Sequence, residues 1–161
     1  MNRLLALLSE STNFSTAQLA MMLNEPEDYI KAQIREYEKS GIIVGYKALV
    51  NWEKVQDAGV TALIELKVTP KMETGFDEIA QRITEFEQVE SVYLMAGAYD
   101  LAVYVRGETI QDVATFVSRK LSAMEGIIST ATHFLLKRYK EGGTPDAWSR
   151  RYGRRPRHHP A

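Results

Sequence analysis

Residues 89–106 read VESVYLMAGAYDLAVYVR, and this stretch decides the fold of the chain. Both of its halves are rich in Val, Tyr and Leu, residue types that favour strands. Gly97 and Ala98 separate the halves and are typical of a tight turn. The stretch therefore predicts an antiparallel hairpin with the strands Val89–Ala96 and Tyr99–Arg106.

A strand and a helix are predicted on each side of this hairpin. Val60–Val68 has apolar residues at every second position, which is typical of a half-buried strand. Apolar residues then recur at helical spacing over residues 76–86 and again over 110–121, and Ile127–Leu136 has the composition of a last strand. This order predicts an α+β fold, a ferredoxin-like βαββαβ domain over residues 60–141, with both helices on one face of its sheet.

The other face of this sheet has no predicted cover. It carries the residues of opposite parity, among them Thr61, Leu63, Tyr93, Met95 and Tyr104. Monomeric proteins rarely expose a large apolar patch of this kind to water. We therefore expect a homodimer in which two sheets pack face to face, as in a dimeric α+β barrel.

The first part of the chain predicts three helices. The first covers Arg3–Leu8, and the second covers Thr16–Leu23 and begins at a capping box formed by Ser15 and Gln18. The third runs from about Pro26 to Ser40. Its apolar stripe consists of Ile30, Ile34 and Tyr37. This arrangement is typical of a helix-turn-helix, whose last helix enters the DNA major groove, although a generic three-helix packing unit fits the spacing as well.

The residues after the third helix are β-prone. Gly41 can end the helix, and Ile42–Tyr46 then resembles the wing that often follows a recognition helix. The sequence thus predicts a winged helix-turn-helix domain over residues 1–46. A linker strand and hinge are expected over residues 47–59, with the strand near residues 50–52.

Composition excludes several classes of protein. Apolar residues make up 45% and charged residues 25% of the 161 residues, the balance of a folded globular protein. The absence of cysteine excludes disulfide scaffolds, thiolate zinc sites, iron–sulfur clusters and cysteine nucleophiles. No run approaches the roughly 20 apolar residues of a membrane-spanning helix, and the apolar run within Met1–Glu10 is too short for a signal peptide. We therefore expect a cytoplasmic protein without membrane contact.

A net charge of −1 conceals a strongly basic end. From Lys137 onward there are eight bases and two acids, and residues 142–161 combine Gly-Gly, prolines and arginines. This composition predicts a flexible basic tail that attracts phosphate without sequence preference. A poorly ordered terminus without a function is the alternative. The pair His158 and His159 is not interpreted as a metal site.

Three motifs together resemble the Lrp/AsnC (feast/famine) family of transcription regulators. They are Gly41-Ile42-Ile43-Val44-Gly45-Tyr46, Gly97-Ala98-Tyr99-Asp100-Leu101, and Ile128-Ser129-Thr130-Ala131-Thr132 running into Lys137. The resemblance covers about residues 3–140 and implies a dimer with a C-terminal ligand-sensing (RAM) domain. It also implies binding to promoter DNA, further assembly into octamers, and an amino acid or related metabolite as effector.

The resemblance places the effector at the hairpin turn. The matching positions are Gly97, Ala98, Tyr99 and Asp100, with Thr130 and Thr132 nearby. Backbone amides of the turn can bind a carboxylate and Asp100 can bind an ammonium group, so a zwitterion finds both partners. The alternative is structural: Gly97 supplies a positive φ, Tyr99 packs across strands, and Asp100 binds turn amides.

The candidate DNA-binding residues lie on the third predicted helix. They are Asp28, Lys31, Ala32, Arg35 and Lys39. The three cations among them are spaced by four residues and can hold phosphates, with a solvated helix face as the alternative. The helix opens with Glu25-Pro26-Glu27-Asp28, whose carboxylates either stabilise the helix dipole or accept a hydrogen bond from cytosine N4. A dimer places two such helices about 34 Å apart, so we expect near-palindromic double-stranded DNA as the partner.

Two other classes of function compete with a regulator. A small enzyme on a dimeric α+β barrel needs convergent polar groups, but His133 is the only histidine of the predicted folded region, and no acid–base pair or metal-ligand spacing accompanies it. We expect no catalytic residue, metal or cofactor. The second alternative is a metabolite-sensing or assembly protein of the same fold whose N-terminal helices bind protein in place of DNA.

Overall fold

The computed structural model describes residues 2–143. Among these, residues 2–51 and 139–143 form one compact unit and Trp52–Arg138 form another. Each unit has its own hydrophobic cluster. Residues 144–161, which contain most of the predicted basic tail, lie outside the described residues.

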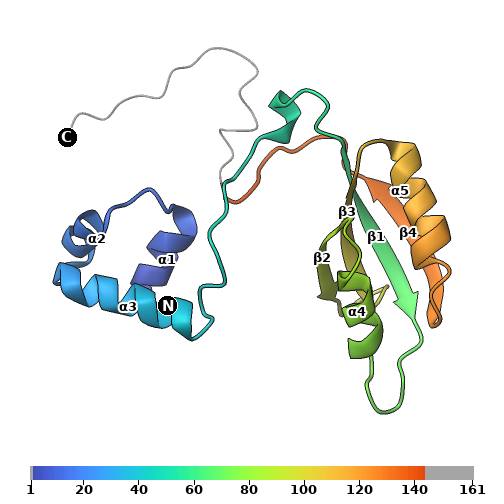
Figure 1. Ribbon diagram of the computed structural model, residues 1–161, viewed down its shortest axis with the longest axis horizontal. Helices are drawn as coiled ribbons and strands as arrows, with labels where there is room; N and C mark the ends of the chain where they lie inside the picture. The colour runs from blue at the N-terminus through green and yellow to red at the C-terminus, as the bar shows by residue number, and fades with distance from the viewer. Residues whose placement is uncertain (1, 144–161) are drawn as a thin grey trace. The chain divides into compact units, whose positions relative to one another are not determined.

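The first unit contains three helices, α1 (Arg3–Glu10), α2 (Thr16–Leu23) and α3 (Glu27–Lys39) (Figure 1). The predicted capping box is present at the start of α2. The backbone N–H of Gln18 donates to the Ser15 hydroxyl, and the backbone N–H of Ser15 donates to the side-chain oxygen of Gln18. Asn24 adopts a left-handed conformation and turns the chain into α3. The predicted helix-turn-helix order is confirmed.

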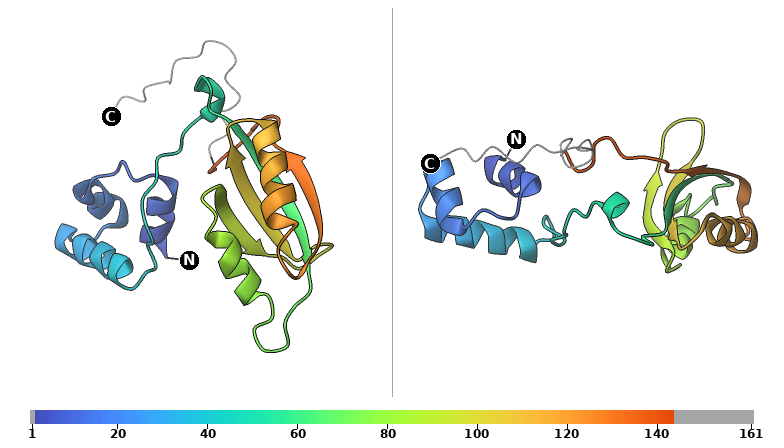
Figure 2. Two further views of the ribbon diagram at one scale, coloured as in Figure 1. Left: turned by 45° about the vertical axis from the view of Figure 1, so that its right-hand side comes forward. Right: turned by 90° about the horizontal axis from the view of Figure 1, so that it is seen from above.

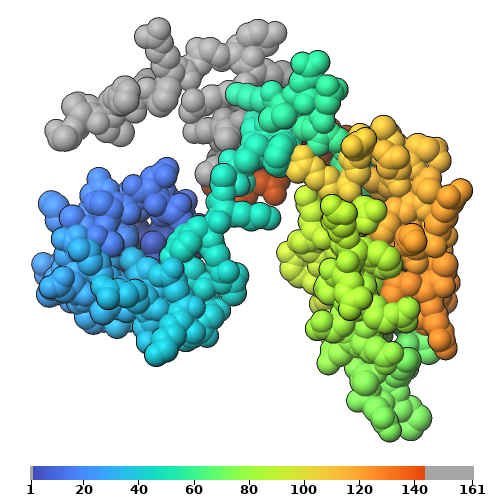
Figure 3. Space-filling model, in the orientation of Figure 1, coloured from blue at the N-terminus to red at the C-terminus, as the bar shows by residue number. Residues whose placement is uncertain are grey.

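The core of this unit is small and fully apolar. Its buried members are Leu4, Leu19, Ala20 and Ile30. Phe14 packs against them from the position before the α2 cap, where a hydrophobic staple places an apolar residue. Ile34 and Tyr37 join the cluster, so the apolar stripe of α3 faces inward. In the space-filling view the three helices (blue to cyan) close on one another as one packed body (Figure 3).

The predictions of a β wing at residues 42–46 and of a linker strand near residues 50–52 are wrong. Among the described residues, 42–51 contain no strand, and a short 3-10 helix, η1 (Trp52–Lys54), follows them. A strand needs a neighbouring strand for its amides and carbonyls, and no ladder in the described part of the chain includes these residues. The side chains are accordingly exposed, with 94% of Val44 open to solvent.

The second unit has the predicted ferredoxin-like order. Its elements are β1 (Val60–Val68), α4 (Asp77–Thr84), β2 (Val89–Leu94), β3 (Leu101–Gly107), α5 (Ile110–Phe116), the π-helical turn η2 (Val117–Leu121) and β4 (Ile127–Phe134). The strands form one antiparallel sheet in the order β2-β3-β1-β4. Both helices lie on the same face of this sheet (Figures 1 and 2).

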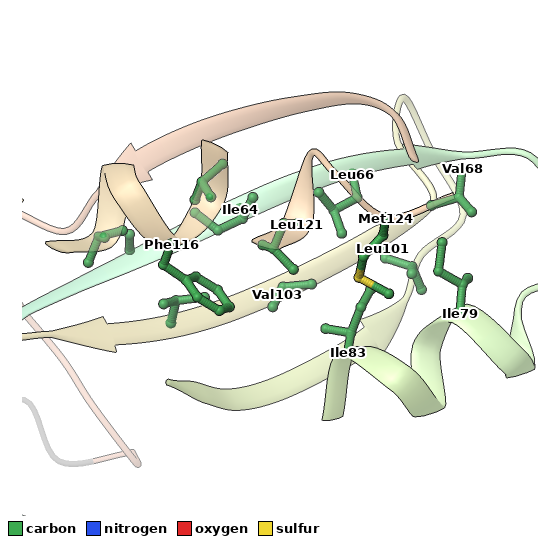
Figure 4. Packing of buried hydrophobic residues seen from close by; sticks show 14 residues of the cluster. Ile64, Leu66, Val68, Ile79, Ile83, Leu101, Val103, Phe116, Leu121 and Met124 are labelled. Carbon is green, nitrogen blue, oxygen red and sulfur yellow. The ribbon is translucent and has the colours of Figure 1, made fainter. Parts of the chain in front are cut away.

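The core of the second unit lies between the sheet and its helices. Alternate residues of β1 and β3, including Ile64, Leu66 and Val103, are fully buried. In Figure 4, Ile83 of α4 and Phe116 of α5 point toward these strand residues. The alternation read from the sequence thus assigned the residues of β1 to the correct faces, and its inward residues fix which residues remain on the outer face.

Gly59 is a position in this unit where both the backbone conformation and the space exclude a larger side chain. Its φ is +80°, and a Cβ there would lie 2.4 Å from the carbonyl oxygen of Gly107. We expect Gly59→Ala to lower the free energy of unfolding by about 2 kcal/mol or more, because backbone strain and the clash add. Chemical denaturation measures this. Gly97→Ala is the matched control, since a Cβ at Gly97 meets nothing within 4 Å, and an equal loss in both variants would contradict the prediction.

Candidate functional site

The outer side of α3 presents most of the predicted DNA-binding residues together. Asp28, Ala32, Arg35 and Lys39 are exposed, and at about 100° per residue their directions fall within about 60° of one another. This arc lies opposite the buried Ile30. We call these four residues the outer ridge of α3. Its order is carboxylate, methyl group, guanidinium and ammonium.

Lys31 lies on one flank of the ridge and already has a partner. Its ammonium nitrogen is 3.5 Å from Oε1 of Glu27, one turn earlier. The Thr16 hydroxyl donates to the same oxygen at 2.7 Å. The hydrogen bond from Thr16, and then the charge of Lys31, lower the pKa of the Glu27 carboxyl below its ordinary value. Glu27 therefore connects the first turn of α2 to the first turn of α3.

Asp28 has a different environment from its neighbour Glu27. Its side chain is exposed, and the structure gives it no hydrogen bond or ion pair with any residue in the described range 2–143. The same holds for Arg35. Sequence reasoning treated Glu27 and Asp28 as one acidic opening. The contacts of Glu27 with Thr16 and Lys31 distinguish it from Asp28. Of these contacts, only the pairing with Lys31 could be predicted, from the spacing of four residues.

Tyr29 lies on the other flank of the ridge. It was not among the DNA-binding residues predicted from the sequence. Its side chain is 49% exposed although it is large and aromatic. An exposed tyrosine beside a cationic ridge can donate its hydroxyl to phosphate or lay its ring against a base. The available signal was its position next to Asp28, outside the stripe of Ile30 and Ile34.

The predicted effector residues of the hairpin turn lie together between β2 and β3. Asp100 anchors this loop to β1: the Val68 amide donates to its Oδ2 at 2.8 Å, and the Asp100 amide donates to the Leu66 carbonyl at 2.9 Å. The Met95 amide donates to the Asp100 carbonyl at 2.8 Å. One carboxylate oxygen of Asp100 thus has a structural partner, as the structural alternative proposed, although that partner belongs to β1 and not to the turn.

Gly97 is not explained by backbone conformation. Its φ is not positive, and a Cβ at this position would meet nothing within 4 Å. The interpretation that the turn needs a glycine for positive φ is therefore wrong. Gly97 and Ala98 are exposed and Tyr99 is half-buried, so the loop presents its backbone to solvent.

Thr130 and Thr132 lie on β4, which β1 separates from the strands β2 and β3 that this loop connects. They are on the edge strand β4, paired with Leu66 and Ile64 of β1. Directly paired residues of an antiparallel ladder share a face, so both threonines project on the helix side of the sheet. Two strand spacings of about 4.8 Å separate β4 from β3. The sequence could not show this, since residues 127–134 have no clear apolar alternation that assigns their faces, and the pairing partner of the strand is not visible in it.

Among the described residues, the outer face of the sheet has no helix over Leu63, Tyr93 and Tyr104, as predicted, although at one end the Arg106 guanidinium lies over the Trp52 ring (Figure 2). Leu63 lies at its centre, paired with Tyr104 on one side and His133 on the other. The Tyr93 ring meets the Tyr104 ring edge-on, with centroids 6.2 Å apart, and the Tyr93 side chain remains 53% exposed. Nε2 of His133 is 3.4 Å from Oε1 of Glu65. His133 is thus a paired strand residue.

The described part of the chain has neither a cluster of metal-binding side chains nor a helix that could cross a membrane. Residues 2–143 contain no group of three or more His, Cys, Asp and Glu side chains that could hold a metal ion. No helix formed by these residues is both long and apolar enough to cross a membrane. The features that the two units offer are therefore a ridge, a loop and a sheet face.

Comparison with known proteins identifies a family model and relatives that match this chain. The model of the Lrp/AsnC ligand binding domain matches residues 61–145. An uncharacterized HTH-type transcriptional regulator of Bacillus subtilis (strain 168), YugG, is 48% identical over 141 residues, which are 87% of this chain and 85% of the relative.

Two solved structures share the fold. A transcriptional regulator from Neisseria meningitidis in complex with L-Met has a TM-score of 0.71 at 19% identity, covering 89% of this chain and 95% of the other. A feast or famine regulatory protein from M. tuberculosis complexed with L-methionine has a TM-score of 0.69 at 21% identity, covering 86% and 90%. At these identities the structural likeness extends to the fold alone.

Proposed function

The chain belongs to the Lrp/AsnC family of helix-turn-helix transcription regulators, and from this premise we propose that it contacts DNA through the outer ridge of α3 and Lys31 on its flank. It is a DNA-binding regulator with an effector-binding C-terminal domain. Its relatives are regulators and not enzymes. The enzyme interpretation and the interpretation without DNA therefore give way.

The observation that carries the proposed DNA contact is the division of α3 into two sides. The side with Ile30 packs in the core, and the side with Asp28, Ala32, Arg35 and Lys39 is exposed in the described part of its unit. Recognition helices place their N-terminal residues at base edges. Arg35 and Lys39 then lie farther along the helix, where they can neutralise phosphates.

A second copy of this chain is the proposed cover of the outer sheet face. Leu63, Tyr93 and Tyr104 give this face an apolar surface on a sheet whose helices occupy the opposite side. Self-complementary packing of two such faces is the simplest symmetric arrangement. The resulting dimer carries two α3 helices, one from each protomer, which suits a near-palindromic operator with half-sites about 34 Å apart. Further assembly of dimers into octamers follows the family pattern.

An amino acid is the proposed effector, bound at Gly97, Ala98, Tyr99 and Asp100, with Thr130 and Thr132 as more distant members of the site. Exposed backbone at Gly97 and Ala98 can donate to a carboxylate. The Asp100 oxygen that is not bonded to Val68 can accept from an ammonium group. L-methionine, which is bound in two solved proteins of this fold, is the first probe. A regulator works where its DNA is, so the proposed location is the cytoplasm.

A gel-shift experiment with the DNA upstream of the gene for this protein tests the function. We expect a retarded band at nanomolar protein that survives an excess of unrelated DNA. Addition of L-methionine or another amino acid should change the affinity or the mobility of the complex. Retardation that unrelated DNA abolishes equally well would contradict specific recognition.

A further inference from the structure

Two adjacent carboxylates at the start of α3 differ in what they contact. Oε1 of Glu27 accepts from Thr16 and lies against Lys31, so this carboxylate is used within the helix-turn-helix itself. Asp28 points to the outer ridge, and no described residue gives it a hydrogen bond or an ion pair. Both carboxylates lie in the first turn of α3 and favour its positive end, but only Glu27 has side-chain partners among the described residues, so the Asp28 carboxylate is open to a partner outside the chain.

The place of Asp28 on the ridge is the place where bases are read. It lies in the first turn of α3, and the N-terminal residues of a recognition helix contact base edges. The next ridge residue, Ala32, ends at a methyl group, so no long side chain holds this part of the helix away from the groove. Asp28 is about 10 Å along the helix axis from Arg35, at about 1.5 Å per residue. It is therefore separate from the part of the ridge that we assign to phosphate.

The chemistry of a carboxylate limits what it can accept in the major groove. An ionised carboxylate only accepts hydrogen bonds, and phosphate oxygens and the N7 and O6 atoms of guanine are acceptors that repel it. Adenine presents a donor beside its N7 acceptor. Cytosine presents the N4 amino group, which pairs with Asp or Glu and has an acceptor, O6 of the paired guanine, on one side only, whereas the adenine amino group lies between N7 and O4 of the paired thymine.

We propose that Asp28 is a specificity-determining residue that accepts a hydrogen bond from N4 of a cytosine in each operator half-site. The proposal rests on the proposed contact between α3 and DNA. It also explains why an anion is kept on a cationic ridge. A site without this cytosine leaves the carboxylate facing acceptors, so Asp28 weakens binding to wrong sequences more than to the right one.

Selection from a library of randomised DNA tests this assignment with the full chain. We expect wild type to select cytosine at one fixed position of each half-site. Asp28→Asn should replace that cytosine by adenine, because an amide both donates to N7 and accepts from N6. Asp28→Ala should lose the preference at this position and keep the others. Direct titration should show a preference of about tenfold for cytosine in wild type and for adenine in Asp28→Asn.

Glu25→Gln is the matched control, since it removes an equal charge in the turn before α3. It should leave cytosine selected. A motif that stays unchanged in both Asp28 variants would overturn the role of Asp28 while leaving DNA binding by α3 intact. A wild-type pool without a common motif would overturn both proposals. Because Asp28 is exposed and has no described side-chain partner, its variants should lose only the small stabilisation of the helix dipole and melt within a few degrees of wild type, which is checked before selection.

Discussion

Replacing Leu63 with glutamate should leave the protein monomeric. Leu63 occupies the middle of the outer sheet face between Tyr104 and His133, so two copies packed there would bury two unpaired carboxylates against each other. Burying such charges costs several kcal/mol, and we expect the dissociation constant of the dimer to rise more than about a hundredfold. Sedimentation velocity at micromolar concentration measures this change.

The same variant should also bind DNA poorly. Two linked recognition helices engage one operator with a high effective concentration, and a monomer loses that gain. Gln81→Glu, on the exposed side of α4, is the matched control and should remain dimeric. Tyr93→Glu provides a second test on the same face, because this side chain is already half exposed and its replacement does not disturb the core. A wild-type monomer at micromolar concentration, or a dimer that persists in both sheet variants, would contradict the proposed interface.

Two substitutions of Asp100 should separate its structural role from its proposed role in binding. Asp100→Ala removes the acceptor of the Val68 amide and should lower the free energy of unfolding by about 1–2 kcal/mol. Asp100→Asn keeps an acceptor there and should lose much less. Both variants remove the negative charge, so both should weaken binding of the amino acid effector by about tenfold or more.

Calorimetric titration, with L-methionine as first probe and the other amino acids after it, measures the binding part of this prediction. Chemical denaturation measures the stability part. Glu108→Gln, an exposed charge outside the loop, is the control for a general change in charge. If Asp100→Asn responds to every amino acid as wild type does, the effector site lies elsewhere and Asp100 serves only to hold the loop to β1.

Local patterns predicted the elements of this fold well. The capping box of Ser15 and Gln18 depends on residues three apart, and the alternation in Val60–Val68 follows from one strand alone, so both can be read from the sequence. The segment at residues 42–46 has strand-forming residues too. Strand formation there depends on a partner strand, which the described chain does not supply, and composition carries no information on that partner.

The placement of the candidate residues on α3 and in the loop between β2 and β3 could be predicted, and their contacts with residues distant in the chain could not. The ridge of α3 follows from helical spacing, which also identifies the buried Ile30. The contact of Thr16 with Glu27 and that of Val68 with Asp100 join residues far apart in the chain, so no local pattern predicts them. The face that Thr130 takes depends on its pairing with Leu66 of β1, which is also distant in the chain.

The central claim, that the outer side of α3 holds DNA, is tested most directly by the dependence of DNA affinity on salt concentration. Each phosphate contact contributes about one to the slope of log affinity against log salt. We predict that Lys31→Ala and Arg35→Ala each reduce the slope by about one per protomer and weaken binding across all sequences, while Lys71→Ala, in the other unit, changes neither. Slopes and affinities equal to wild type in the double variant Lys31→Ala/Arg35→Ala would show that α3 is not the element that holds DNA.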